Sequence, residues 1–151
     1  MRVTARTDYA LRAVIELAAA DDRLVSAVEI AQAQQIPKQF LDAILRDLRR
    51  GGIIVSHRGS AGGFRLAREA TSISLADVIR AVDGPLATVR GEAAQNLSYE
   101  GTASALQLVW IAVRSELREL LDNISVQDVA ASTLPKRVTA LADDPAAWTS
   151  R

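Results

Sequence analysis

One proline, Pro37, most constrains how this chain can fold. Proline disfavours helix at the residue before it and is well placed at the first position of a new helix. The helical patterns on either side of Ile36-Pro37 therefore predict two separate helices joined by a tight turn. The first is expected to begin after Ser26, which forms a capping box with Glu29, and to end near Gln34.

The helix after the turn is expected to begin at Pro37 and to run to about Arg50, where Gly51-Gly52 stops it. An earlier helix is expected over Thr7–Ala20, with its first threonine as the N-cap. The helix after the turn carries apolar residues at helical spacing, which are Phe40, Leu41, Ile44, Leu45 and Leu48.

Two short β-rich runs follow, at Ile53–Ser56 and Phe64–Leu66. The segment between them, residues 58–63, is rich in glycine. Short β-rich runs that flank such a segment predict a β-hairpin with a flexible tip.

The C-terminal half contains a longer helical pattern. Ser74 is expected to cap a helix over Leu75–Val82, and the mixed composition of 86–102 predicts a loop. A long helix is expected over 103 to about 123, followed by a short one near Val126–Ala131. The long helix has a continuous apolar stripe, made by Leu106, Val109, Trp110, Val113, Leu117, Leu120 and Leu121.

Composition agrees with a helical fold, because only 4% of the residues are aromatic and the core must rest on Leu, Ile, Val and Ala. We therefore expect a mainly α fold with a small β-hairpin wing, namely a winged helix-turn-helix plus a long C-terminal dimerisation helix. The expected division is a winged helix-turn-helix at 1–84, a loop at 85–102, a long and a short helix at 103–132 and a loosely held tail at 133–151.

The formal net charge is zero, but the charge is unevenly distributed. Residues 1–70 have a net charge of +3 and residues 71–151 a net charge of −3. Residues 37–68 hold seven bases against Asp42 and Asp47, a net charge of +5. The seven bases are Lys38, Arg46, Arg49, Arg50, Arg58, Arg65 and Arg68. Such a local basic face favours binding to nucleic-acid phosphates.

A helix-turn-helix places the N-terminal residues of its second helix against base edges in the major groove. Here those residues are Lys38, Gln39 and Asp42, while Arg46 and Arg49 lie further along and are expected at phosphates. The arginine at the start of the hairpin loop is expected in the minor groove. The full expected DNA-contacting set is Arg2, Lys38, Gln39, Asp42, Arg46, Arg49, Arg58, Gly59, Gly62 and Gly63.

Several of these segments together resemble the Rrf2 family of bacterial transcriptional regulators, over roughly residues 1–130. They are Tyr9–Ala13, Glu29–Ala31, Ile36–Leu41, Ile44-Leu45, Leu48, Arg58-Gly59 with Gly62-Gly63-Phe64 and Leu66, Ile73–Val78 and Asp83–Pro85. The resemblance implies a repressor that binds a pseudo-palindromic operator on double-stranded DNA. It also implies a homodimer whose long helices cross, with Leu106, Trp110, Val113, Leu117 and Leu120 at the seam. On this resemblance 1–84 is the DNA-binding domain, 85–102 the sensor-position loop and 103–132 the dimerisation helices.

Many relatives of this kind carry three cysteines before the long helix and bind an iron–sulfur cluster there, in some cases with an acidic residue from the partner subunit. This chain has an acid at the matching place, Asp8, but no cysteine. Thiolates are the usual cluster ligands, so we expect no cofactor and no bound metal. The expected sensor region is made by Asp8, Glu92, Tyr99 and Trp110, and it is open to a small-molecule ligand or a protein partner as the effector.

Several of the residues assigned to DNA contacts or to the sensor region also have a purely structural interpretation. Arg49 and Arg50 suit a solvated helix end, and Gly62-Gly63 suits an ordinary turn. Trp110 suits core packing. Asp8 suits the first turn of a helix, and His57 an exposed surface or a phosphate contact.

Other classes of protein find little support. No nucleophile–base pair, metal-ligand cluster or phosphate-binding loop is visible, so the chain is not expected to be an enzyme. No apolar run reaches the length of a membrane span and no signal peptide is visible, which predicts a cytoplasmic protein without membrane contact. An interaction module controlled by a partner protein or a ligand is the alternative function.

Overall fold

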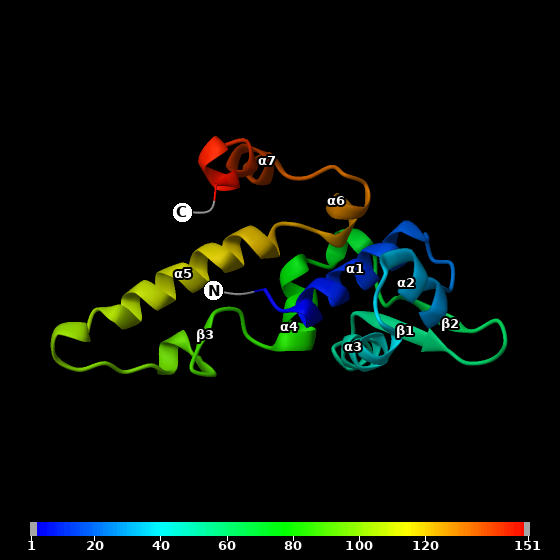
Figure 1. Cartoon of the computed structure of the whole chain (residues 1–151), viewed down its shortest axis with the longest axis horizontal. Helices are drawn as coiled ribbons and strands as arrows, with labels where there is room; N and C mark the ends of the chain where they lie inside the picture. The colour runs from blue at the N-terminus through cyan, green and yellow to red at the C-terminus, as the bar shows by residue number, and fades with distance from the viewer. Residues whose placement is uncertain (1–2, 150–151) are drawn as a thin grey trace.

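The computed structural model describes residues 3–149, and helices dominate it, with two small two-stranded antiparallel sheets beside them. This confirms the expected mainly α fold with a hairpin wing. In Figure 1 the N-terminal elements pack together, and one long helix extends away from them. The N-terminal elements are α1 (Ala5–Ala19), α2 (Ala27–Gln34), α3 (Lys38–Arg50), β1 (Ile54–His57), β2 (Gly63–Leu66), η1 (Ala70–Ser72) and α4 (Leu75–Asp83).

The elements that follow are β3 (Thr88–Val89), β4 (Glu92–Ala93), η2 (Ala94–Asn96), η3 (Gly101–Ala103), α5 (Leu106–Asp122), α6 (Val126–Ala130), α7 (Lys136–Ala142) and η4 (Pro145–Trp148). Across residues 3–149, no helix combines the length and the apolar composition that crossing a membrane requires.

The hydrophobic core lies where α1 to α4, the hairpin and α6 meet. Aliphatic side chains fill it, as the composition predicts. The largest fully buried ones are Leu17, Ile30, Leu41, Ile44, Leu48, Ile54, Ile73, Val14, Val25, Val78 and Val126.

Helix α1 begins earlier than expected, at Ala5, and Thr4 rather than Thr7 is its N-cap. The hydroxyl of Thr4 accepts from the backbone N–H of Thr7 at 3.0 Å. Thr7 is itself buried, and its hydroxyl donates to the side chain of Asp83 at the end of α4. Two threonines three residues apart are equivalent as caps in the sequence, and the tertiary contact with α4 decides between them.

The segment 86–102 is not a plain loop. Thr88–Val89 and Glu92–Ala93 pair as a short hairpin, and both turn residues, Arg90 and Gly91, have positive φ (55° and 81°). A two-residue hairpin turn of this kind requires positive φ at both positions. Two-residue strands are too short to produce a detectable alternation, which is why the sequence pattern missed them.

After α5 the chain returns to the N-terminal unit. The backbone N–H of Leu75 donates to the Ile124 carbonyl (2.9 Å), and that of Val126 donates to the Ile73 carbonyl (2.8 Å). Val126 is fully buried in the shared core. Helix α6 therefore belongs structurally with α1 to α4, although the sequence division grouped it with the dimerisation segment 103–132.

The expected loose tail is instead folded. Residues 136–142 form α7, and Arg137 pairs with Glu116 (3.0 Å) and with Glu119 on α5. Both acids lie on the exposed side of α5, one turn apart, so a single guanidinium bridges them. This ion-pair bridge between distant segments has no local sequence signature.

Candidate nucleic-acid interface

Helix α3 separates its buried and exposed residues as the helix-turn-helix pattern predicts. On its inner side Leu41, Ile44, Leu45 and Leu48 are at most 2% exposed. The outer side chains are all exposed, and they are Lys38, Gln39, Asp42, Arg46, Arg49 and Arg50. Each residue expected at base edges or phosphates on α3 therefore faces solvent.

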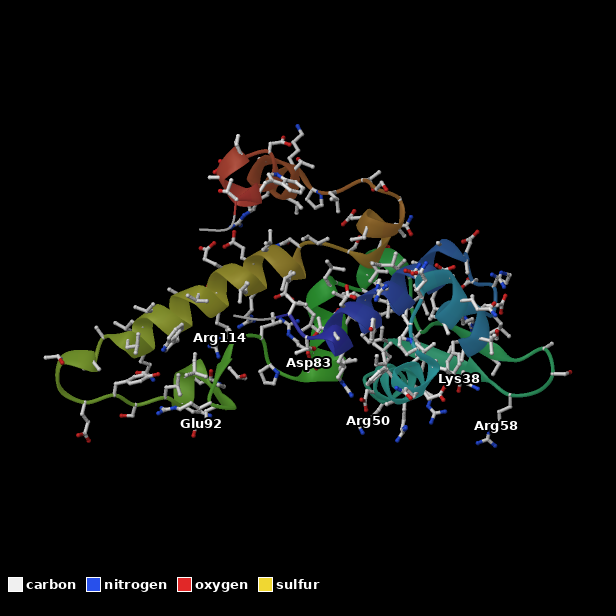
Figure 2. All side chains as sticks on the ribbon, viewed as in Figure 1. Lys38, Arg50, Arg58, Asp83, Glu92 and Arg114 are labelled. Carbon is white, nitrogen blue, oxygen red and sulfur yellow. The ribbon has the colours of Figure 1, made fainter. Side chains whose placement is uncertain are left out.

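The seven bases between residues 37 and 68 fall into two groups. Three are held by carboxylates: Arg50 by Asp47 (2.6 Å), Arg65 by Asp22 (3.6 Å) and Arg68 by Asp77 (2.9 Å). Within the described range 3–149 the other four have no acidic side chain at ion-pair distance: Lys38, Arg46, Arg49 and Arg58. Lys38 and Arg58 lie along the same edge of the molecule (Figure 2). The uncompensated cations are all members of the expected DNA-contacting set.

The turn before α3 is tight and well fixed. Gln35 ends α2 in the left-handed conformation (φ 52°), and Ile36 is only 3% exposed. At the other end of α2, the Ser26 hydroxyl accepts from the N–H of Glu29, whose carboxylate accepts from the N–H of Ser26 (2.7 Å). The predicted capping box is confirmed, and it orients α2 as the brace for α3.

The capping box shifts the acidity of Glu29. Hydrogen bonds from the Ser26 backbone and hydroxyl, with a further one from Arg23, lower the pKa of Glu29 from 4.5 to about 2. These bonds favour the charged carboxylate in the folded state, so its contribution to stability is fully present above pH 4.5 and is lost as the pH falls toward 2.

A pH titration of stability checks this. The Glu29→Gln variant is expected to melt at a lower temperature than the parent at neutral pH. The difference between the two melting temperatures is expected to narrow as the pH falls from 4.5 toward 2. Circular dichroism melting curves measure it. Glu69→Gln is the charge control, because Glu69 is exposed and its carboxylate makes no capping hydrogen bond, although the residue precedes η1. If the difference in melting temperature stays constant between pH 4.5 and 2, the capping hydrogen bonds of Glu29 are not its cause.

Asp47, outside the expected contact set, fixes how α1 and α3 meet. It is 9% exposed and accepts hydrogen bonds from Arg6 of α1 and from Arg50. The same Arg6 guanidinium lies 3.7 Å from Asp83 at the end of α4. The sequence analysis missed this pair, and the signal that was available for it is a carboxylate on the buried side of a helix, beside Leu48. This network of ion pairs holds α3 in a fixed orientation. It also explains why Arg50, paired with Asp47, is not available to a DNA phosphate.

Phe40 was grouped with the apolar residues that recur at helical spacing on α3, but it is not buried with them. Its side chain is 52% exposed, and its ring lies 6.3 Å from that of Tyr9. The guanidinium of Arg12 lies 4.9 Å from the centre of the Tyr9 ring. Position 40 falls on the flank of α3, where α1 covers only one side of the ring, so helical spacing alone overestimated its burial.

The hairpin forms a wing next to α3. Arg49 of α3 donates to the Ser56 hydroxyl of β1 (3.2 Å), and the tip that carries Arg58 is exposed. Gly59 has a φ of 112°, which favours glycine. The wing therefore extends the exposed cationic edge of α3.

The glycine pair at the base of the wing allows close packing. A Cβ on Gly62 would lie 2.3 Å from the His57 carbonyl oxygen, and one on Gly63 would lie 2.8 Å from that of Val25. Val25 and Phe64 exchange backbone hydrogen bonds (2.9 and 2.8 Å), which tie the wing to the start of α2. Packing thus explains both glycines, and their expected DNA contacts stay predictions.

Replacing Gly63 by alanine is expected to lower the free energy of unfolding by about 1–3 kcal/mol, because the backbone of Val25 cannot move away without losing its pairing. Urea unfolding of the two proteins measures the difference. Ser60→Ala at the exposed wing tip is expected to change stability by less than about 0.5 kcal/mol. Equal stability of Gly63→Ala and the parent contradicts the anchoring role.

Helix α5 is the least buried long element of the structure. It has 17 residues, ten of them apolar, and none is fully buried. Leu106, Val109 and Leu108 are 36%, 51% and 68% exposed. The remaining members of the expected seam are half-buried, and they are Trp110, Val113, Leu117 and Leu120.

The four residues of the expected sensor region each have different surroundings, and their grouping into one site stays a prediction. Asp8 pairs with Arg12 on α1 at 2.9 Å, as suits a first-turn acid. Glu92 is exposed in the β3–β4 hairpin, and the Tyr99 ring lies 5.9 Å from the Arg90 guanidinium. The indole N–H of Trp110 is buried without a hydrogen-bond partner among the described residues. Between residues 3 and 149, no hydrogen bond or ion pair joins these four. Arg2, from the DNA-contacting set, lies outside the described residues.

Two short helices, a tight turn, an exposed basic helix and a glycine-tipped wing define a winged helix-turn-helix protein. The chain belongs to the Rrf2 family: the family model, described as "Iron-dependent Transcriptional regulator", matches residues 3–132. The resemblance seen in the sequence is therefore confirmed.

Relatives agree with this assignment. Rv1287 of Mycobacterium tuberculosis, whose name describes an HTH-type transcriptional regulator, is 47% identical over 145 residues, covering 95% of this chain and 90% of the relative. The solved structure of CymR, the global cysteine regulator of B. subtilis, has a TM-score of 0.73 at 30% identity and covers 88% of this chain and 98% of that one. The solved structure of T. potens IscR has a TM-score of 0.69 at 27% identity, and the match covers 100% of this chain and 93% of that one.

The iron in the family description does not fit the side chains of this chain. The sequence has no cysteine, and its single histidine, His57, lies in the exposed wing. Over residues 3–149, no three His, Cys, Asp or Glu side chains come together as a metal site. Carboxylates such as Asp8, Glu92 and Glu100 suit hard cations rather than sulfide clusters. This chain thus combines the DNA-binding fold of the family with a donor set that cannot ligate a cluster through thiolates.

Proposed function

We propose that this chain is a sequence-specific DNA-binding repressor that acts as a homodimer without an iron–sulfur cluster. The observation that carries the proposal is the group of four cations, Lys38, Arg46, Arg49 and Arg58, that remain uncompensated on α3 and the wing. Cations without carboxylate partners on an exposed helix and loop are available to phosphates, and phosphate neutralisation supplies much of the affinity for DNA.

Within this face we assign roles by position along α3. Gln39 and Asp42 lie near the N-terminus of the helix and read bases, with Lys38 beside them. Arg46 and Arg49 hold phosphates, and Arg58 enters the minor groove. Phe40, exposed on the same first turn, adds an apolar surface suited to a thymine methyl group.

The dimer is supported by the exposure of α5. Leu106, Val109, Val113, Leu117 and Leu120 recur at helical spacing along one side of a helix that buries none of its residues completely within one chain. A second copy packed on the same stripe buries it symmetrically. Such a dimer presents two α3 helices about 34 Å apart, or a multiple of this distance, to a pseudo-palindromic site.

The remaining expectations form part of this proposal. The protein has no catalytic activity and acts at the chromosome, in the cytoplasm. Residues 1–84 bind DNA, α5 within the expected dimerisation segment 103–132 forms the dimer, and 85–102 occupy the position at which relatives with cysteines hold their cluster. Anaerobically purified protein is expected to be colourless, without stoichiometric iron and sulfide.

Genome-wide mapping of the bound DNA, followed by gel-shift titration on the mapped sites, tests the proposal. Two chains are expected per site, and affinity is expected to fall by about 10³ or more between 50 and 200 mM salt if six or more phosphates are contacted. A chain that is monomeric by light scattering at micromolar concentration, or that binds no duplex specifically, contradicts the proposal. Derepression of the adjacent genes on deletion distinguishes a repressor from an activator.

A further inference from the structure

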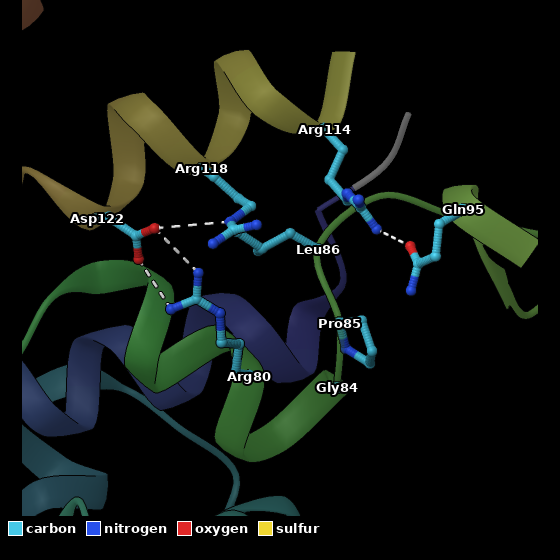
Figure 3. Close-up of a pocket in the computed structure, with 8 residues that line it drawn as sticks. All are labelled: Arg80, Gly84, Pro85, Leu86, Gln95, Arg114, Arg118 and Asp122. Atoms are coloured by element: carbon cyan, nitrogen blue, oxygen red, sulfur yellow. Dashed lines mark hydrogen bonds and ion pairs between the residues drawn. The ribbon is translucent and has the colours of Figure 1, made fainter. Parts of the chain in front are cut away.

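An open cleft of about 610 Å³ lies between α4 and α5 (Figure 3). Its base is the Gly84–Leu86 segment that leaves α4, and Gln95 of η2 closes one side. The cleft is separate from the expected sensor residues, none of which lines it. Its volume falls in the range of small-molecule sites.

Three guanidinium groups converge on this cleft, from Arg80 of α4 and from Arg114 and Arg118 of α5. The only carboxylate in its lining is Asp122. Arg80 donates to both oxygens of that carboxylate, at 2.8 and 3.1 Å. This bidentate pair lowers the pKa of Asp122 and raises that of Arg80.

The other two arginines are poorly compensated. Arg118 reaches Asp122 only at 3.9 Å, and its side chain is 58% exposed. Arg114 donates to the amide oxygen of Gln95, a neutral acceptor. Two guanidinium groups one helical turn apart repel each other, and an oxyanion between them relieves that repulsion while accepting charge-assisted hydrogen bonds.

The residues that line the cleft indicate which kind of anion it can bind. Pro85 and Leu86 add apolar surface beside the guanidinium groups. Arginine forks match the planar geometry of carboxylate and the oxygen edges of phosphate. We propose that this cleft binds a small organic oxyanion, carrying carboxylate or phosphate groups, which is the effector of this regulator.

The position of the cleft gives such a ligand a means to act, and this part rests on the proposed function. Arg80 belongs to the N-terminal unit that carries α3, whereas Arg114 and Arg118 belong to the proposed dimerisation helix. Arg80 is already joined to α5 through Asp122, so the anion is held by Arg114 and Arg118 against the Gly84–Leu86 segment that leaves α4. It adds a second tie between the end of α4 and α5 and so changes the distribution of angles between the two DNA-binding units. It shifts operator affinity because its contacts differ between those arrangements.

Binding is tested first without DNA. Calorimetric titrations with inorganic phosphate and with citrate, at constant ionic strength in chloride buffer, are expected to show saturable binding of one anion per chain. Comparison of the two anions distinguishes a phosphate-bearing ligand from a polycarboxylate. Arg114→Gln and Arg118→Gln are each expected to weaken binding about tenfold or more. Arg137→Gln, an arginine paired on α7 outside the cleft, is the matched control and is expected to bind normally.

Three outcomes overturn the proposal. One is the absence of saturable binding by either anion, and another is unchanged binding in both cleft variants. The third is loss of the dimer in both cleft variants by sedimentation, which assigns these cations to contacts between subunits. In a second step, a saturating anion is expected to change gel-shift affinity in the parent but not in Arg118→Gln. Unchanged affinity in the parent removes the effector role, whereas failure to bind DNA even without anion contradicts the proposed function instead.

Discussion

Leu117→Asp is expected to split the proposed dimer and to abolish operator binding. A symmetric seam places each substitution in the interface twice, and burial of an unpaired carboxylate costs several kcal/mol. The dimer dissociation constant is therefore expected to rise about a hundredfold or more. Sedimentation velocity over a concentration series measures the constant, and a gel shift measures the loss of operator affinity.

Two further variants make this result interpretable. Leu117 is half-buried in the single chain, so its variant could also destabilise the fold. Val109→Asp avoids this because Val109 is 51% exposed before any partner is added, and it is expected to have the same effect on the dimer. Ser115→Asp is the matched control: Ser115 is exposed and faces away from Val113 and Leu117, two residues on either side. If Val109→Asp and Ser115→Asp both remain dimeric, the seam lies elsewhere.

Gln39→Ala and Arg49→Ala are expected to impair DNA binding in different ways. Gln39→Ala is expected to relax sequence preference by roughly 1–3 kcal/mol at one position in each half-site, because an amide that reads a base edge is removed. Arg49→Ala is expected to weaken binding to all sequences alike and to reduce the salt slope by about one for each phosphate that is no longer neutralised. Binding measurements on a panel of single-base operator variants, at several salt concentrations, separate the two effects.

The charge control for this experiment is Arg68→Gln. It removes one positive charge from the same sequence window, but Arg68 is held by Asp77 (2.9 Å) and is not free for a phosphate. It is expected to leave both affinity and salt slope close to those of the parent. Uniform losses in Gln39→Ala and Arg49→Ala would show that Gln39 does not read a base.

Local chemistry decided much of this fold. The Ser26–Glu29 capping box and the Ser74 cap of α4 depend on residues within a few positions of one another, and both are present as predicted. The turn at Ile36-Pro37 also separates two helices, but Pro37 is the extended N-cap of α3, which begins at Lys38 and not at the proline. The wing was equally visible, because its glycines lie between two short β-rich runs. Such signals are contained in the sequence since the interactions that produce them are local.

Which cations are available in the candidate DNA-binding site could be determined only from the tertiary structure. The sequence contains seven bases in one window, but only the fold shows that Arg50, Arg65 and Arg68 pair with carboxylates. The other four have no carboxylate partner among residues 3–149. The contacts between Arg6 and Asp47, and between Thr7 and Asp83, span 41 and 76 positions. No local pattern encodes partners at such separations.

The same distinction applies to the arginine cleft and the C-terminal tail. Arg80 and Asp122 are 42 positions apart, and Arg137 reaches back 21 positions to Glu116. The sequence alone determined the presence of helices α1 to α6 and the basic character of α3, although it misplaced the start of α1 and missed α7. The tertiary structure decided which charges neutralise each other and which remain available, because ion pairing depends on separations of a few ångströms in space, whereas helix formation depends on neighbours along the chain.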